Sequence, residues 1–302
     1  MPARRPAAWR RLAARRTGLA GAALLIGIFL LCYLTLPWSL ARYTSQNLHA
    51  TLQAPSPRHI FGTDELGRDL FWRFTLGGAI SLGIGLCSAT IAVFIGVAVG
   101  VAAGYLGGRT DALLMRAVDV LYGLPTILLV ILLRVALVPR ATVLLTYWGI
   151  AGPHTVANLL VLLVGIGGVS WLTMARVIRT QVMSLRNQPF IEAARAAGVG
   201  HWRLVRRHLL PGLIGTIMVY AALTVPVAIL QESFLSFLGL GIQQPLPSWG
   251  NLTSEGVRAI NPIHTPWWLL LWPCLGLCIT LLSLNFLGDA LQEIWDPRRS
   301  VR

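Results

Sequence analysis

Two long apolar segments flank residues 189–211, which read PFIEAARAAGVGHWRLVRRHLLP. Pro189 suits the first position of a helix, and Glu192 in the first turn complements the helix dipole. The alanines that follow favour a strong but slim helix, and Gly198 permits a sharp change of direction. A second helix is predicted from His201 to Leu210. Two short helices at an angle, slim on one arm and basic on the other, would form a compact peg.

Two uses of this peg stay open on physical grounds alone. The peg could insert into a groove on a soluble partner. Alternatively, it could rest as an interfacial helix pair on anionic lipid, which would attract Arg203, Arg206 and Arg207.

The composition places the chain in a membrane. Of its 302 residues, 55% are hydrophobic and 12% are charged, whereas soluble domains carry about 25% charged residues. Six apolar runs approach the ~20 residues that cross a ~30 Å hydrocarbon layer. Continuous runs of this kind fit helices and not the alternating strands of a barrel. We therefore predict an all-α integral membrane protein with six transmembrane helices, near Gly18–Leu36, Gly77–Ala103, Val118–Val138, Ala157–Ala175, Gly212–Leu230 and Trp267–Leu287.

The net charge of +14 comes from 25 arginines, since the chain has no lysine. If the N-terminus is inside, 18 arginines lie in inner segments and 7 in outer ones. The positive-inside rule therefore favours cytoplasmic termini, and the inner arginines would meet anionic lipid headgroups. Membrane topology explains the charge, so no nucleic-acid partner is expected. The outer arginines are Arg42, Arg58, Arg68, Arg73, Arg134, Arg140 and Arg258.

Four regions are predicted along the chain. Residues 1–17 form a basic cytoplasmic tail, and residues 18–75 hold the first transmembrane helix and an outer segment. Residues 76–290 form the core membrane domain, with a cytoplasmic loop at about 184–211, and residues 291–302 form a cytoplasmic tail. A cleaved signal peptide over residues 1–41 is disfavoured, because the apolar run of about nineteen residues exceeds the usual 7–15.

Several local expectations follow from residue type. Gly96, Gly100 and Gly104 share one helix face and would let another helix approach closely, from this chain or from a partner. Thr63 or Asp64 is expected to cap a short outer helix. Cys274 and Cys278 share a helix face without a histidine or carboxylate beside them, which favours apolar packing over a metal pair.

The third and fifth runs carry proline and acidic residues. Pro125, after Gly123, is expected to kink the third run, and residues 139–154 are expected to form a loop along the outer interface. For Asp119, a local ion pair near Arg116 is favoured over a substrate role. After the fifth run, residues 234–250 are too rich in glycine and proline for one regular helix, so a bent or re-entrant piece is expected.

A translocation pathway is suggested at the outer end of the fifth run, where Pro226 loosens the helix. Gln231, Glu232 and Ser233 follow there as candidate pathway residues. Satisfaction of Glu232 by neighbouring backbone groups stays open as the structural alternative.

An ordered series of motifs resembles a known family. Glu192-Ala193-Ala194, Gly198 and Leu210-Pro211 resemble the EAA loop of bacterial ABC importer permeases, with His208 departing from the usual aliphatic residue. Other phrases resemble the C permeases of dipeptide, oligopeptide and nickel importers. They are Gly62-Thr63-Asp64-Glu65-Leu66-Gly67-Arg68-Asp69, Ser236-Phe237-Leu238-Gly239-Leu240-Gly241, Pro247-Ser248-Trp249-Gly250, Asn285-Phe286-Leu287-Gly288-Asp289 and Asp296-Pro297-Arg298.

The resemblance implies a type I ABC importer permease fold and a set of partners. These would be a second homologous permease, two cytoplasmic ATPases and an extracytoplasmic solute-binding protein, all at the bacterial inner membrane. The chain has no phosphate-binding loop of the Gly-x4-Gly-Lys-Ser/Thr type and no lysine to complete one. We therefore expect this chain not to be an enzyme and to bind no cofactor, with ATP and Mg²⁺ used by the partner subunits.

The implied function is import of di- or oligopeptides by alternating access, driven through the EAA loop. Nickel or another small solute remains the alternative substrate. An intramembrane enzyme would need paired catalytic groups at membrane depth, and a self-contained channel or carrier would predict internal repeats or mid-span ionisable residues. Neither pattern is clear in the sequence.

Overall fold

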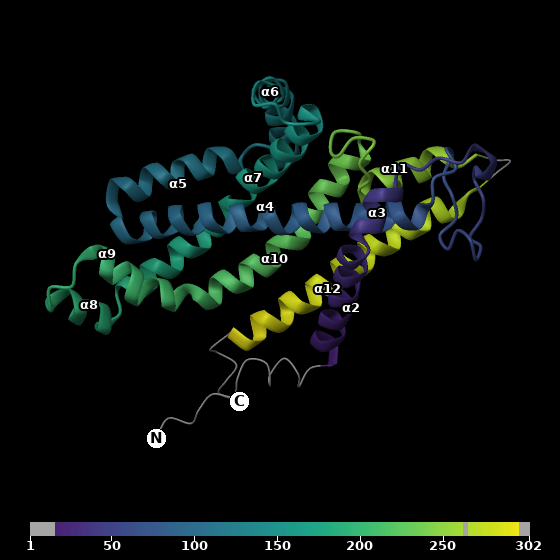
Figure 1. Cartoon of the computed structure of the whole chain (residues 1–302). Helices are drawn as coiled ribbons and strands as arrows, with labels where there is room; N and C mark the ends of the chain where they lie inside the picture. The colour runs from purple at the N-terminus through teal and green to yellow at the C-terminus, as the bar shows by residue number, and fades with distance from the viewer. Residues whose placement is uncertain (1–15, 262–264, 296–302) are drawn as a thin grey trace.

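A computed structural model gives the structure of residues 16–261 and 265–295. The described part is helical, and its one ladder contact is an isolated bridge between Thr63 and Asp69. Most of the predicted tails 1–17 and 291–302 lie outside the described residues. The helices (Figure 1) are α2 (Arg16–Leu34), α3 (Leu36–Arg42), η1 (Leu48–Ala50), α4 (Leu70–Leu106), α5 (Gly108–Tyr122), α6 (Thr126–Tyr147), α7 (Pro153–Arg186), α8 (Pro189–Ala196), α9 (His201–Leu204), η2 (Val205–Leu209), α10 (Leu210–Phe237), α11 (Trp249–Ala259) and α12 (Trp267–Trp295).

Within the described residues, five helices are long and apolar enough to cross a membrane, and the bent pair α2–α3 makes a sixth. The two parts of the pair meet at an angle of 51°. Thr35 lies at the junction, where its hydroxyl donates to the Leu31 carbonyl over 2.6 Å. Pro37 follows in the first turn of α3 and has no amide hydrogen to continue the ladder, which explains the bend.

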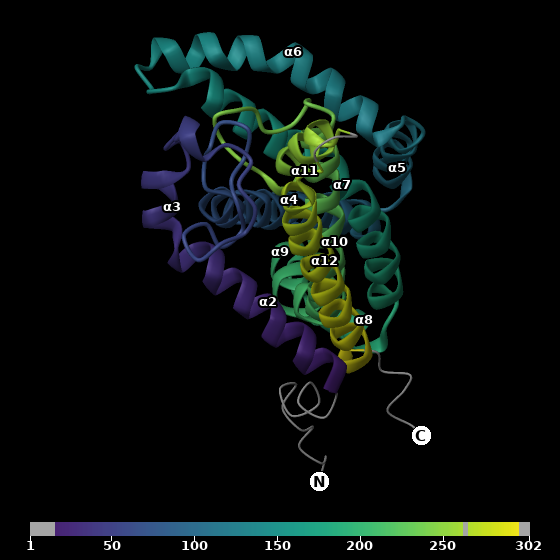
Figure 2. The same ribbon diagram turned by 90° about the vertical axis from the view of Figure 1, so that its right-hand side faces the viewer.

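The third predicted run, Val118–Val138, is not one helix. The chain breaks over 123–125, as Gly123 and Pro125 predicted, because proline disfavours the helical conformation of the residue before it. The predicted outer loop at 139–154 was wrong: α6 continues through Pro139 to Tyr147, and only residues 148–152 connect it to α7. Figure 1 shows α6 end-on while α4 runs across the page, and Figure 2 shows α6 running across, so α6 is steeply inclined to α4.

The closest helix packing joins α4 to α7 through the glycine face predicted from sequence. A Cβ added at Gly96 would lie 2.6 Å from the Met174 Cβ atom. One at Gly100 would lie 2.7 Å from the Ala175 carbonyl oxygen, and one at Gly104 would lie 2.7 Å from that of Arg179. Larger residues would push the two backbones apart. The helix that approaches this face belongs to the same chain.

The outer segment between α3 and α4 is held by Asp64 and Asp69. Asp69 caps α4, since its side chain accepts a hydrogen bond from the Phe71 amide over 2.9 Å. The expected short helix capped by Thr63 or Asp64 does not form. Asp64 instead closes a turn by accepting from the Leu66 and Arg68 amides, each over 2.9 Å, because an aspartate side chain readily bonds the backbone two residues on.

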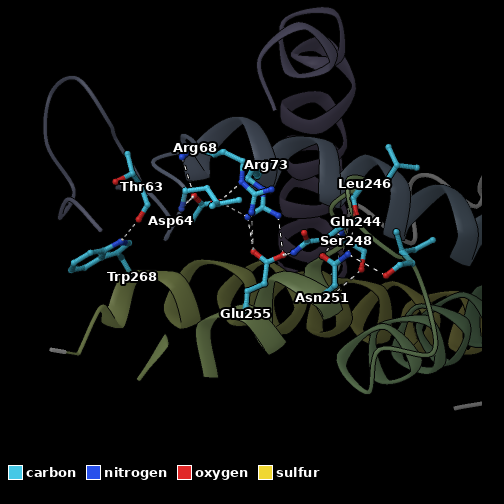
Figure 3. A network of polar contacts seen from close by, with 12 residues as sticks. Thr63, Asp64, Arg68, Arg73, Gln244, Leu246, Ser248, Asn251, Glu255 and Trp268 are labelled. Atoms are coloured by element: carbon cyan, nitrogen blue, oxygen red, sulfur yellow. Dashed lines mark hydrogen bonds and ion pairs between the residues drawn. The ribbon is translucent and has the colours of Figure 1, made fainter. Parts of the chain in front are cut away.

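A buried charge cluster ties this segment to α4 and α11 (Figure 3). The fully buried Arg73 donates to Asp64 over 2.7 Å and to both carboxylate oxygens of Glu255, over 2.6 and 2.9 Å. Arg68 donates to Asp64 over 2.6 Å, and Gln244 donates to Glu255 over 3.0 Å. Two carboxylates therefore neutralise a guanidinium that would otherwise be buried alone, and three segments distant in sequence are fixed together.

The glycine- and proline-rich region after α10 contains a short buried helix, α11. The N-cap Ser248 and Asn251 exchange side chain–backbone hydrogen bonds in a capping box. Trp249 is fully buried and donates its indole N–H to the Phe74 carbonyl over 3.1 Å. The expected bent piece at 234–250 is thus the end of α10, an irregular loop over 238–248 and the first two residues of α11, and α11 itself packs against α4, α10 and α12.

Helix α5 returns beside α4 and is fastened to α7 by ion pairs (Figure 1). Arg179 donates to both carboxylate oxygens of Asp111. These hydrogen bonds hold the pKa of the Asp111 carboxyl below its ordinary value of 3.8, against the opposing effect of burial. Asp119 pairs with Arg176 over 2.7 Å and not with the expected Arg116, because α7 lies across from it.

Replacement Arg73→Met is predicted to destabilise the protein by about 1.5–3 kcal/mol, because Glu255 loses both of its hydrogen bonds to Arg73 and Asp64 keeps only Arg68 as a charged partner. The measurement is thermal unfolding of the purified full chain in detergent. Arg258→Met is the matched control, since Arg258 is exposed on the same outer end. Equal unfolding midpoints for the two variants would contradict a stabilising role for the cluster.

The Arg179–Asp111 pair is predicted to hold α5 in place at neutral pH and to fail in acid. A depressed carboxyl pKa contributes stability above the ordinary value of 3.8, and this contribution is lost as the pH falls through the lowered pKa. Hydrogen exchange of α5, corrected for intrinsic rates, should rise in that acidic range. Asp111→Asn should raise exchange already at pH 7, and Asp119→Asn, at an exposed pair, should change it less. An unchanged α5 in Asp111→Asn would refute the prediction.

Candidate functional site

The segment between α7 and α10 lies at the opposite end of the molecule from α11 and the outer segment (Figure 1). Gln188 is extended and Pro189 occupies the first turn of α8, so the chain turns sharply after α7. Glu192 lies in the first turn of α8, where its charge complements the helix dipole. These features agree with the first helix predicted from the sequence.

Gly198 ends α8 in a left-handed conformation, with φ at +77°. The Gly198 amide donates to the Arg195 carbonyl over 3.0 Å, and the Val199 amide donates to the Ala194 carbonyl over 3.1 Å. This pair of bonds is the Schellman motif, which satisfies the last carbonyls of a helix. A Cβ at Gly198 would meet no atom of this chain within 4 Å, so the glycine is needed here for its backbone conformation and not for internal packing.

One side of the loop is anchored in the helix bundle. Ile191 of α8 and Leu209 of η2 are fully buried, and Leu204 of α9 is nearly so. They form one apolar cluster with Ile178 and Val182 of α7. Burial of an aliphatic side chain of this size contributes about 1.5–3 kcal/mol. The loop is therefore fixed to α7 and α10 and must move with them.

The opposite side of α8 is open to solvent. Glu192, Ala193 and Ala197 are exposed, and Ala194 is half-buried. Phe190 is also 51% exposed, which is unusual for a large apolar side chain in a charged loop. No ion pair involves Glu192 among the described residues. A slim, alanine-lined ridge with one free carboxylate can enter a groove that a bulkier helix could not.

The second arm of the predicted peg is not a separate helix. Residues His201–Phe237 form one continuous helix, in which α9 passes through the π-helical turn η2 into α10. Pro211 explains the wider turn, because it lacks an amide hydrogen and its ring would clash with the carbonyl four residues earlier. The expected helix end at Leu210-Pro211 is therefore a widened turn, and the arm is an extension of α10.

Two contacts brace this arm against the end of α4. The Tyr105 hydroxyl and the His201 Nδ1 atom are 2.6 Å apart. Arg186, in the last turn of α7, donates to the Tyr105 carbonyl over 3.1 Å. The end of α4, the end of α7 and the start of the long helix are thus joined at one place.

At the other end of α10, Glu232 is fully buried among serine hydroxyls. It accepts hydrogen bonds from Ser81 of α4 over 2.8 Å, from Ser236 over 2.7 Å and from Ser233 over 3.2 Å. The Ser236 hydroxyl in turn accepts from the Ile242 amide over 2.9 Å. Glu232 is thus satisfied by side-chain hydroxyls and not by backbone, and it links α4, α10 and the loop before α11.

Of the three residues suggested for a pathway, Glu232 and Ser233 are committed to this buried network. Gln231 is half-buried, and its buried side-chain carbonyl has no hydrogen-bond partner. Of the three, only Gln231 keeps an unpaired polar atom, and that atom is buried in this conformation.

Two polar clusters were missed in the sequence reasoning. The Arg73 cluster depends on Glu255, 182 residues away, so no local pattern could reveal the pair. Arg134 in α6 donates to the Asn158 side chain of α7 over 2.9 Å, and both residues are buried. An arginine inside an apolar helix signals that some partner is needed, but not which one. Within the described residues, no group of three or more metal-ligating side chains is present.

Comparison with known proteins places these features in a family. Residues 96–301 match the family model described as the inner membrane component of binding-protein-dependent transport systems. The chain is 41% identical over 296 residues to the dipeptide transport system permease protein DppC of Bacillus subtilis, covering 96% of this chain and 85% of that protein. It is 39% identical over 288 residues to the oligopeptide permease OppC of Haemophilus influenzae, covering 94% and 86%. Identity to OppC of Escherichia coli K12 is 41% over 283 residues, covering 92% and 87%.

The fold is also found in a solved transporter. A chain of the inward-facing MetNI methionine ABC transporter superposes with a TM-score of 0.55 at 20% identity, covering 74% of this chain and 97% of that one. At this identity the likeness concerns the fold alone, which is that of a type I ABC importer permease. The chain belongs to the family of inner membrane components of binding-protein-dependent transport systems, and it is a multi-pass permease subunit of the inner membrane.

Proposed function

We propose that this permease subunit imports di- or oligopeptides by alternating access. The observation that carries the proposal is the identity of 41% to a dipeptide permease over 296 residues, which extends across nearly the whole chain. Relatives named for oligopeptide transport match over a similar length, which supports peptides as the substrate class.

The proposed partners are a second homologous permease, two cytoplasmic ATPases and an extracytoplasmic solute-binding protein. A binding protein is named in the family description itself. ATP and Mg²⁺ would be used by the ATPases, because this chain has no phosphate-binding loop and no lysine. The free energy of ATP hydrolysis must then reach this chain through a surface that contacts the ATPases.

The exposed side of α8 is the proposed point of entry. Glu192, Ala193 and Ala194 would sit in a groove of an ATPase, with Gly198 holding the turn and Leu210-Pro211 joining the loop to α10. Since Ile191 is fully buried against α7, displacement of α8 would move α7 as well. The loop would therefore act as a rigid unit, and not as a flexible tether.

Continuity of the long helix would carry this motion to the other side of the membrane. Its 37 residues span about 55 Å at 1.5 Å per residue. Near its far end, Glu232 links it to α4 and, through Ser236, to the loop before α11. A tilt imposed at the loop would thus reach the outer end, where Gln231 would line the pathway.

Gly198→Val is predicted to lower coupled ATP hydrolysis and peptide uptake at least about tenfold while the complex still assembles. A β-branched residue at positive φ costs about 1–3 kcal/mol of backbone strain, so the turn after α8 would be lost. Both activities would be measured in proteoliposomes containing the whole transporter.

Gly200→Val is the matched control for this substitution. Gly200 lies two residues away with φ at −62° and ψ at 149°, which valine adopts without strain, and it has open space around it. Gly198→Asn tests the effect of side-chain size apart from backbone strain, because asparagine tolerates the left-handed conformation. Unchanged coupling in Gly198→Val would refute the proposed role of the loop.

The substrate class is tested by uptake of labelled di- and oligopeptides in the same proteoliposomes. We expect uptake to require ATP and the solute-binding protein, and unlabelled peptides should compete while nickel should not. Uptake of nickel that peptides fail to inhibit would replace the peptide assignment. Full transport by this chain without ATPases would contradict the proposed mechanism.

A further inference from the structure

An apolar groove runs along one side of α4 near the loop between α7 and α10. This loop is called the coupling loop, and the end of the molecule that holds it is called the coupling end. The volume of the groove is about 750 Å³. One wall is α4, where Val93, Val97 and Val101 recur every fourth residue, and the other wall includes Val205, Leu210 and Ile217. Its lining is almost wholly apolar, and none of it belongs to the exposed ridge of α8.

The dimensions of the groove suit a single hydrocarbon chain. The wall of α4 extends from Val93 to Leu106, which is about 20 Å at 1.5 Å per residue. One leaflet of a ~30 Å hydrocarbon core is about 15 Å thick. A transmembrane helix is about 10–12 Å across with its side chains. A lipid acyl chain is far thinner and needs no polar contacts.

A basic cavity adjoins the groove at the level of the loop. It has a volume of about 340 Å³ and is lined by Trp202, Arg203, Arg206 and Arg207. Trp202 lines both cavities and is 75% exposed, as an amphipathic ring at a membrane interface would be. The three arginines are exposed, and none of them forms a salt bridge within the described part of the chain, so their guanidinium groups are open to an anionic ligand.

We propose that this groove binds one anionic phospholipid of the leaflet next to the coupling loop. An acyl chain lies along Val93–Leu106 of α4, and the phosphate accepts hydrogen bonds from the guanidinium groups of Arg203, Arg206 and Arg207. An anionic amphiphile matches both the charge of the basic cavity and the apolar lining of the groove. A free phosphate would leave the groove empty, and an acidic protein surface would not fill it. The site is separate from the α8 ridge and does not depend on the transported substrate.

The test uses the full chain purified with its partner permease and phosphatidylglycerol that carries a photoreactive acyl chain. Phosphatidylcholine with the same chain is the neutral control lipid. Adducts mapped by mass spectrometry should concentrate on residues 93–106 and 205–217 with phosphatidylglycerol. The triple change Arg203→Gln, Arg206→Gln, Arg207→Gln should lower this labelling about tenfold or more. Arg195→Gln, which removes one arginine charge from the exposed part of α8, should leave it unchanged.

A second variant tests the groove separately from the charge. Ala98 is exposed in the groove and away from the α4–α7 packing, so Ala98→Trp should fill the groove and abolish labelling without unfolding the chain. Equal labelling by both lipids, or labelling insensitive to Ala98→Trp, would overturn the site. Groove labelling that is absent from this complex but present in the chain purified without its partner would also overturn it, since the partner would then be the occupant.

Discussion

Close backbone packing between α4 and α7 is the constraint on which the rest of the structure depends. Gly96, Gly100 and Gly104 place α7 so near that a methyl group at any of them would overlap its atoms. In a membrane, helix association relies on such packing, because lipid tails are as apolar as the side chains. This contact brings the end of α7 beside the end of α4. Tyr105 can then meet both His201 and Arg186, and the coupling loop is held in one place.

Polar groups perform a different task at the two ends of the molecule. At the end that holds α11, Arg73 and Glu232 each form several hydrogen bonds that join helices and loops. At the coupling end, Glu192 on the α8 ridge and the arginines of the basic cavity have no salt bridge among the described residues. Charged side chains that are paired within the chain stabilise the fold, whereas unpaired charged side chains can bind other molecules. The continuous helix His201–Phe237 connects these two kinds of surface.

Much of this arrangement was predictable because it depends on local chemistry. The apolar runs near α4, α7, α10 and α12 predicted helices of the right type and place, since length and apolarity alone decide membrane insertion. The glycine repeat predicted a close helix contact, and Gly198 predicted the turn after α8. Several of the expectations that failed concerned where helices end. Pro211 and Pro139 were expected to mark boundaries, but the helices continue through both.

The sequence by itself determined the membrane class, the helical elements and the shape of the exposed α8 ridge, because each follows from residues close together in the chain. Only the tertiary structure decided which partners the isolated polar groups find. Arg73 forms hydrogen bonds with Glu255, 182 positions away in the sequence, and Glu232 with Ser81, 151 positions away. Asp119 pairs with Arg176 and not with Arg116, which is closer in the sequence. Those pairings depend on how helices pack, and packing is set by the fit of whole helix faces and not by any single stretch of residues.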